Sequence, residues 1–121
     1  MKQYRYPIRE ETIEIPAGKI DSDEDPEKCA YRELEEETGY KAKKLTLLTS
    51  FYPAIGFANE KIWIYVAKNL VKSNSNTDKD EFVETINVDL NIALDMVSQG
   101  MIKDSKTIIG LLWLDKYLKN E

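Results

Sequence analysis

The most informative part of the chain runs from Gly18 to Tyr40 and reads GKIDSDEDPEKCAYRELEEETGY. Asp25 and Pro26 are typical of a helix start, because aspartate caps free N–H groups and proline fits the first helical position. Gly39 is typical of the residue after a helix, where the backbone takes a positive φ. The segment therefore predicts a helix over residues 25–38 that is entered through a polar loop.

Negative charge is concentrated in the same part of the chain. The 121 residues include 22 acidic and 17 basic side chains, a net charge of −5. Nine acids and two bases lie between Asp21 and Glu37, which gives −7, so the other 104 residues sum to +2. Glu33, Glu36 and Glu37 share a helix face about 100° wide, on which like charges repel by about 0.2–0.5 kcal/mol per pair. This face is either a solvated acidic surface or a binding site for a hard divalent cation.

Composition excludes several classes of function. The chain has no histidine, which excludes Ser-His-Asp and Cys-His catalysis, and its single cysteine, Cys29, excludes an internal disulfide and a cysteine zinc site. Oxygen ligands alone point to Mg²⁺ or Mn²⁺, or to Ca²⁺, rather than to zinc. The negative charge argues against a nucleic-acid partner, and no apolar run is long enough to span a membrane. The first residues do not resemble a signal peptide, so we expect a cytoplasmic protein.

Hydrophobic patterns predict strands and helices on both sides of the acidic helix. We expect strands at 12–15, 44–52, 61–67 and 82–88, and helices at 91–99 and 105–118. Interleaved strands and helices predict an α/β (α+β) layered domain around a mixed sheet. No linker or repeat divides the chain, so we expect one domain over residues 1–121. The aromatic residues at positions 52, 57, 63 and 65 are expected in the core rather than stacked on a ligand.

The order of residues from Gly18 to Tyr40 resembles the Nudix box, Gly-x5-Glu-x7-Arg-Glu-U-x-Glu-Glu-x-Gly-U, in which U is a bulky aliphatic residue. Every fixed position matches, and Tyr40 is the one loose fit. Outside the box the chain resembles the ADP-ribose pyrophosphatase branch of this family. The similar segments are residues 3–6, 13–21, 52–56, 78–81 and 102–104.

This resemblance implies a fold and an activity. The fold is an α/β/α sandwich around a mixed sheet, with box residues 18–40 forming loop, helix and loop. The reaction is attack of water on phosphorus in a small nucleoside diphosphate derivative, and ADP-ribose would give AMP and ribose 5-phosphate. The cofactor would be Mg²⁺ or Mn²⁺, with about two or three ions bound alongside substrate.

The resemblance also assigns roles to residues of the box. The metal-binding groups are the carboxylates of Glu33, Glu36 and Glu37 and the backbone carbonyl of Ala17. Arg32 resembles the arginine that orients these glutamates for catalysis. Two more positions, 24 and 18, correspond to a supporting acid and to a glycine that lets the backbone pass close to the metals.

Three positions outside the box are assigned in the same way. Glu81 is the first choice for a loop acid that activates water or binds metal, and Asp80 is the second; a solubilising loop is the alternative. Arg5 resembles an arginine that contacts phosphate or ribose oxygens of the substrate, with a surface strand arginine as the alternative. Gly56 lies in a turn that the resemblance places at the substrate.

The chain departs from the branch in three places. Ile55 stands where the branch has a proline, and Lys79 stands where a branch member carries an acid. Branch members also have a further region before the segment that begins at Gln3, so we expect either a truncated chain or a natural minimal member. The resemblance is compatible with a homodimer, although that further region usually forms it. Two alternatives remain, a Nudix hydrolase for another nucleotide and a Nudix-like module that binds without turnover.

Overall fold

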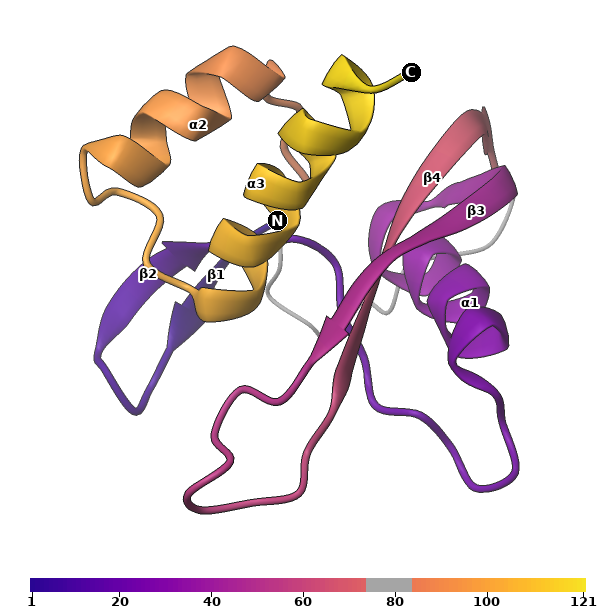
Figure 1. Ribbon diagram of the computed structural model, residues 1–121, viewed down its shortest axis with the longest axis horizontal. Helices are drawn as coiled ribbons and strands as arrows, with labels where there is room; N and C mark the ends of the chain where they lie inside the picture. Colours follow the sequence, from indigo (N-terminus) through magenta and orange to yellow (C-terminus); the bar gives the residue numbers. More distant parts are fainter. Residues whose placement is uncertain (74–83) are drawn as a thin grey trace.

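A computed structural model describes residues 1–73 and 84–121 and shows helices and strands in alternation (Figure 1). Its elements are β1 (Lys2–Arg5), β2 (Glu10–Ile13), α1 (Pro26–Thr38), β3 (Tyr40–Phe51), β4 (Ile62–Lys72), α2 (Leu90–Ser98) and α3 (Ser105–Lys119). The layered α/β class is confirmed. Within the described residues, no helix is both long and apolar enough to cross a bilayer.

Helix α1 has the ends that the sequence predicts. The Asp25 side chain accepts a hydrogen bond from the Lys28 N–H at 2.9 Å, and Pro26 occupies the first turn. Gly39 has a φ of 77°, and its N–H donates to the Glu35 carbonyl at 2.9 Å. An aspartate cap of this kind stabilises a helix by about 1 kcal/mol. The acidic face is therefore carried on a helix with two well-defined ends.

The strands of the described residues form two antiparallel pairs rather than the expected mixed sheet. β1 pairs with β2, and β3 pairs with β4. The long β3–β4 pair contains a register shift between Leu47 and Thr49. The lengths of the connections favour this pairing, because the four residues between β1 and β2 and the ten between β3 and β4 are fewer than the dozen or so that a parallel crossover needs.

The β3–β4 pair is the middle layer of the domain. Figure 1 shows it between α1 and α3, and α2 packs on α3. Ile64 is buried on β4, and Gly110 brings α3 close to it: a Cβ on Gly110 would lie 3.2 Å from Ile15 Cδ1 and 3.6 Å from Ile64 Cγ2. The other residues of β4 are partly or fully exposed, so this strand is less enclosed than its apolar sequence predicts.

The expected strand at 82–88 is wrong for its described part. Residues 82 and 83 lie outside the described residues, and Glu84 forms only an isolated antiparallel bridge with Lys2. Lys2 gives both its N–H and its carbonyl to Glu84, at 2.8 and 3.0 Å, whereas the Met1 carbonyl faces the other side and accepts the Glu14 N–H at 2.6 Å. Residues 85–88 form no further strand pairing.

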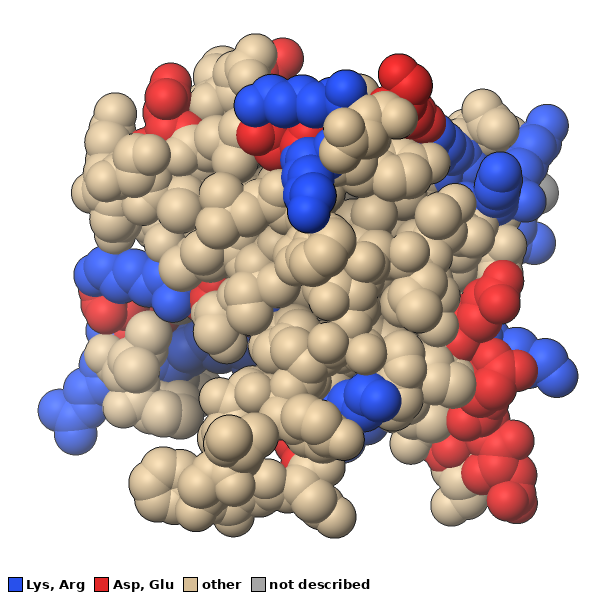
Figure 2. All heavy atoms as spheres, viewed as in Figure 1, with Lys and Arg blue, Asp and Glu red and all other residues tan. Residues whose placement is uncertain are grey.

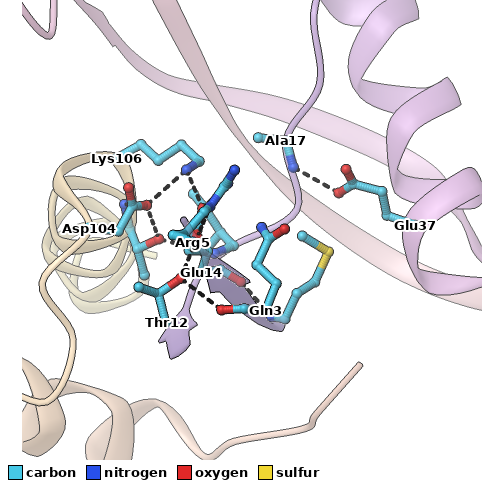
Figure 3. Close-up of polar contacts among 11 residues, drawn as sticks. Gln3, Arg5, Thr12, Glu14, Ala17, Glu37, Asp104 and Lys106 are labelled. Atoms are coloured by element: carbon cyan, nitrogen blue, oxygen red, sulfur yellow. Dashed lines mark hydrogen bonds and ion pairs between the residues drawn. The ribbon is translucent and has the colours of Figure 1, made fainter. Parts of the chain in front are cut away.

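A buried carboxylate joins the β1–β2 hairpin to α3. Glu14, only 3 % exposed, accepts two hydrogen bonds from Arg5 at 2.7 Å and one from Lys106 at 2.8 Å (Figure 3). The Thr12 hydroxyl donates to the same carboxylate at 2.5 Å. Because these donors favour the charged form, above all the Arg5 guanidinium, the pKa of Glu14 lies far below its usual value.

Replacing this carboxylate tests its contribution to stability. The folded pKa of Glu14 lies far below the ordinary value of 4.5, so its contribution is fully present above 4.5 and is lost gradually as the pH falls from there through the folded pKa. We expect Glu14→Gln to lower the free energy of unfolding by about 1–3 kcal/mol at pH 7 and by a smaller amount at pH 3. Urea unfolding followed by tryptophan fluorescence at both pH values measures this difference.

The matched control is Glu11→Gln. Glu11 pairs with Lys2 at 3.2 Å, and both side chains are exposed, so this variant should change stability by less than about 1 kcal/mol. An equal loss for Glu14→Gln at pH 7 and pH 3 would contradict the assignment of its effect to charge.

Candidate functional site

Arg32 lies at the centre of the acidic face of α1. Its Nη1 donates to Glu33 Oε1 at 2.8 Å and to Glu36 Oε2 at 3.3 Å. Its Nε and Nη2 both contact Glu24 at 3.0 Å, and Nη2 also lies 3.3 Å from an Asp21 oxygen. One guanidinium therefore binds acids from the helix and from the loop before it, which offsets their mutual repulsion.

The contacts between Arg32 and Glu24 shift the pKa values of both groups. The Arg32 guanidinium lowers the pKa of Glu24 to about 2, with help from the Asp21 N–H, which donates to Glu24 at 3.1 Å. In turn, the hydrogen bonds to Glu24 raise the pKa of Arg32 above its ordinary value. The Arg32–Glu24 pair is therefore fully charged at neutral pH.

Acidic side chains cover the side of the molecule that carries this cluster. Figure 2 shows them gathered along the edge where α1 and its preceding loop lie in Figure 1. Glu33 is largely covered, with 17 % of its side chain exposed, whereas Glu36 is 52 % exposed. Carboxylate oxygens on this surface therefore lie at two depths. Those of Glu33 lie close to the backbone of the loop, and those of Glu36 point out towards solvent.

Gly18 lies directly against the Glu33 side chain. A Cβ at position 18 would be 1.9 Å from Glu33 Cδ and 2.3 Å from its Oε1. The φ of Gly18 is not among the positive values in the chain, so space rather than backbone conformation calls for glycine here. Buried Cys29 holds the same loop, because its thiol donates to the Lys19 carbonyl at 3.5 Å, and burial raises its pKa.

The turn before Gly18 contacts a second glutamate of the helix. The Ala17 N–H donates to Glu37 Oε2 at 2.9 Å, which brings the backbone at 17 and the Glu37 carboxylate together (Figure 3). The expected ligand at this position is the carbonyl of Ala17. In the structure it is the N–H of Ala17, and not its carbonyl, that contacts Glu37. The two predicted positions are therefore neighbours, but the contact uses a different atom of Ala17 from the expected one.

The donor set fits a hard divalent cation, although its members do not converge on one point. Among residues 1–73 and 84–121, no three Cys, Asp or Glu side chains are arranged as a ready metal site. The Arg32 guanidinium binds both Glu33 and Glu36, as a cation would. Two observations support the fit: every candidate ligand is an oxygen, and the space beside Gly18 accommodates the Glu33 carboxylate.

The predicted residues outside the box are dispersed. Arg5 belongs to the Glu14 cluster, with 47 % of its side chain exposed. Gly56 lies in the loop between β3 and β4, where an added Cβ would meet no described atom within 4 Å. Glu81 and Asp80 lie outside the described residues.

Two aromatic side chains expected in the core are on the surface. Phe57 is 96 % exposed and Tyr52 is 54 % exposed, because the β3–β4 loop extends beyond the layers that could cover it (Figure 1). Trp63 and Tyr65, on β4 itself, are partly buried. The strand residues thus follow the packing expectation and the loop residues do not.

Sequence reasoning missed the cluster around Glu14. Its members come from β1, β2 and the start of α3, and the contact of Glu14 with Lys106 spans 92 residues. The one local signal is a glutamate between Ile13 and Ile15 in a short apolar run. This pattern indicates that the glutamate side chain faces inward only when a basic partner for the glutamate is already known.

Comparisons with known proteins give both sequence relatives and a structural neighbour. The sequence profile of the NUDIX domain matches residues 1–106. An ADP-ribose pyrophosphatase of Bacillus subtilis (strain 168) is 45 % identical over 116 residues, and a methanol dehydrogenase activator of Bacillus methanolicus is 46 % identical over 116 residues. Each alignment covers 94 % of this chain and 63 % of the relative. The chain thus spans less than two thirds of either relative's length.

More distant relatives show the same partial coverage. A GDP-mannose pyrophosphatase of Escherichia coli O1:K1 / APEC is 34 % identical over 105 residues, which are 84 % of this chain and 54 % of that protein. A crystal structure of an ADP compounds hydrolase superposes with a TM-score of 0.88 at 24 % identity, covering 98 % of this chain and 64 % of that one. This likeness confirms the fold.

Substitution of Gly18 tests its contact with Glu33. We expect Gly18→Ala to lower the free energy of unfolding by about 1–3 kcal/mol, because the new methyl group overlaps the Glu33 side chain. In a Glu33→Ala background the overlapping atoms are gone, so the same substitution should cost little. Urea unfolding of the four proteins gives the coupling between the two positions. If Gly18→Ala lowers the free energy of unfolding equally in both backgrounds, the contact with Glu33 is not the reason for glycine at position 18.

Proposed function

This chain belongs to the Nudix family, and we propose that it is a pyrophosphohydrolase that depends on a divalent metal and cleaves ADP-ribose or a related nucleoside diphosphate sugar. Water attacks phosphorus, the diphosphate P–O–P linkage breaks, and a nucleoside monophosphate and a sugar phosphate leave. The 45 % identity to an ADP-ribose pyrophosphatase supports ADP-ribose as the first substrate to test. The GDP-mannose pyrophosphatase relatives support the wider class.

The observation that carries this proposal is the contact of two box glutamates with the turn at 17–18. Glu37 accepts the Ala17 amide, and Glu33 fills the space beside Gly18. Helix α1 and this turn thus bring two carboxylates and a backbone segment next to one another. An acidic surface of this kind repels a diphosphate, so a substrate of that class requires a cation between the two.

We propose Mg²⁺ or Mn²⁺ as this cation, held by the carboxylates of Glu33, Glu36 and Glu37 with the Ala17 carbonyl, and by Glu81. When bound, such ions neutralise the phosphate oxygens and make water more acidic. The protein's own part is to carry the helix glutamates beside the turn at residues 17–18. Carboxylates are the ligands that suit these metals, and histidine is not required.

In this proposal Arg32 is the residue that orients the glutamates. Its guanidinium binds Glu33 and Glu36 on one side and Glu24 on the other. The charged Glu24 fixes the guanidinium plane, so rotation of either helix glutamate away from the site would break a charge-assisted hydrogen bond. Glu24 therefore supports the site through Arg32.

The substrate-binding residues we propose are Arg5 and Gly56. Arg5 is half-exposed while Glu14 fixes its guanidinium, and a held guanidinium is suited to phosphate oxygens. Gly56 stands in the loop that carries Phe57, whose exposed ring is accessible to a nucleobase, and Tyr52, whose ring lies under the Lys61 ammonium at 5.8 Å. With these assignments, the proposed site includes residues for the phosphate oxygens and the nucleobase of a nucleoside diphosphate sugar, in addition to the metal-binding face.

The proposal is tested by a panel of substrates with each metal. ADP-ribose, GDP-mannose, a dinucleotide and a modified nucleoside triphosphate are incubated with Mg²⁺ or Mn²⁺, and the phosphate products are separated by chromatography. Preferred turnover of a nucleoside diphosphate sugar supports the proposal, whereas preference for another nucleotide changes the substrate class. Binding of panel members without metal-dependent turnover would favour the binding-module alternative.

Neutralising single glutamates of α1 tests their roles. We expect Glu36→Gln and Glu37→Gln to lower kcat by about 100-fold or more, with unchanged melting temperatures, because each removes a charged oxygen from the site. Glu35→Gln is the matched control, since Glu35 lies on the other side of the helix and pairs with Lys41 at 3.6 Å. Steady-state rates at saturating metal measure the effect, and near-normal rates in both test variants would remove these residues from the site.

The late acidic loop is tested by a second pair of variants. We expect Glu81→Gln to lower kcat more than Asp80→Asn, because Glu81 is the proposed ligand or base. Steady-state kinetics of both variants on the best panel substrate decide the order. The opposite ranking would move the role to Asp80.

A further inference from the structure

The first turn of α3 holds the chain just before the proposed site. The Ile15 N–H donates to the Thr107 hydroxyl at 3.0 Å, although the two residues are 92 positions apart. The Thr107 hydroxyl in turn donates to Asp104 Oδ2 at 2.6 Å. Thr107 is 2 % exposed, so its hydroxyl is shielded from water.

The chemistry of position 107 is fixed by its two partners. The Asp104 carboxylate only accepts hydrogen bonds and the Ile15 amide only donates one, so the group between them must do both. A hydroxyl meets this requirement, whereas valine, which has the same shape as threonine, meets neither half of it. Asp104 is also the cap of α3 and accepts the Thr107 N–H at 3.2 Å, so the carboxylate is itself held in place.

A short, stiff connection leads from this contact to the helix glutamates. Ile15 is followed by Pro16, whose ring fixes φ, and then by Ala17, whose N–H donates to Glu37 at 2.9 Å. A shift of the Ile15 backbone is therefore passed on to the Ala17 amide with little freedom to absorb it. Figure 3 shows the Asp104 and Lys106 side of this arrangement beside the Ala17–Glu37 contact.

We propose that Thr107 is a positioning residue: through the Ile15 backbone it sets the place of the Ala17 amide, and so the orientation of the Glu37 carboxylate. This inference rests on the proposed function for its effect on catalysis. The structural part of the inference is that the Ala17–Glu37 contact depends on Thr107. This part does not require the protein to be catalytically active. The proposed site thus depends on a residue of α3 that lies behind it and touches neither metal nor substrate.

The test compares Thr107→Val with Thr107→Ser. In ¹⁵N-labelled protein, we expect the valine variant to shift the Ala17 amide resonance and to speed its hydrogen exchange, and the serine variant to resemble the wild type. On the best panel substrate, the valine variant should lower kcat about 10-fold with KM little changed, and serine should restore kcat to within about twofold.

The control variant is Ala93→Gly, which removes a buried methyl group on α2, outside residues 15–17 and the first turn of α3. It should destabilise the protein and leave the Ala17 resonance and kcat unchanged. A Thr107→Val protein with a wild-type Ala17 amide, or an Ala93→Gly protein with the same loss of kcat, would overturn the inference. A wild-type protein that turns over no panel member overturns the proposed function, and the Ala17 amide then decides the positioning role alone.

Discussion

The Arg32 guanidinium makes the acidic helix compatible with a folded domain. Without a cation between them, Glu33 and Glu36 would repel each other across one helix turn, and Glu24 would repel both. The guanidinium binds all three, and it ties the loop before α1 to the helix that follows. The close approach of the backbone at Gly18 and the contact of Ala17 with Glu37 depend on a loop held in this way.

Much of this arrangement is readable in the sequence, because local chemistry determines it. The bounds of α1 follow from Asp25, Pro26 and Gly39, and the common face of its glutamates follows from helical spacing. The contacts of Arg32 with Glu33 and Glu36 are also local, one and four positions along the helix. These features need no information about distant parts of the chain.

Features set by distant partners could not be predicted in the same way. The cluster around Glu14 requires Lys106, and whether the expected strand at 82–88 forms depends on a distant partner, Lys2, which pairs with Glu84 alone among the described residues of that segment. Phe57 was expected in the core from its hydrophobicity, but exposure depends on where the β3–β4 loop extends. Burial of a loop aromatic is a property of the tertiary arrangement, which hydropathy alone does not encode.

The contact between Ile15 and Thr107 also has a consequence for the order of folding. Helix α1 and its arginine contacts form within one short segment, but the Ile15–Thr107 hydrogen bond closes a loop of 92 residues. Closure of such a loop costs entropy that only later packing offsets, so we expect contacts of this kind to form late. We therefore expect the docking of α3 to be the step that completes the site, after helix α1 has formed.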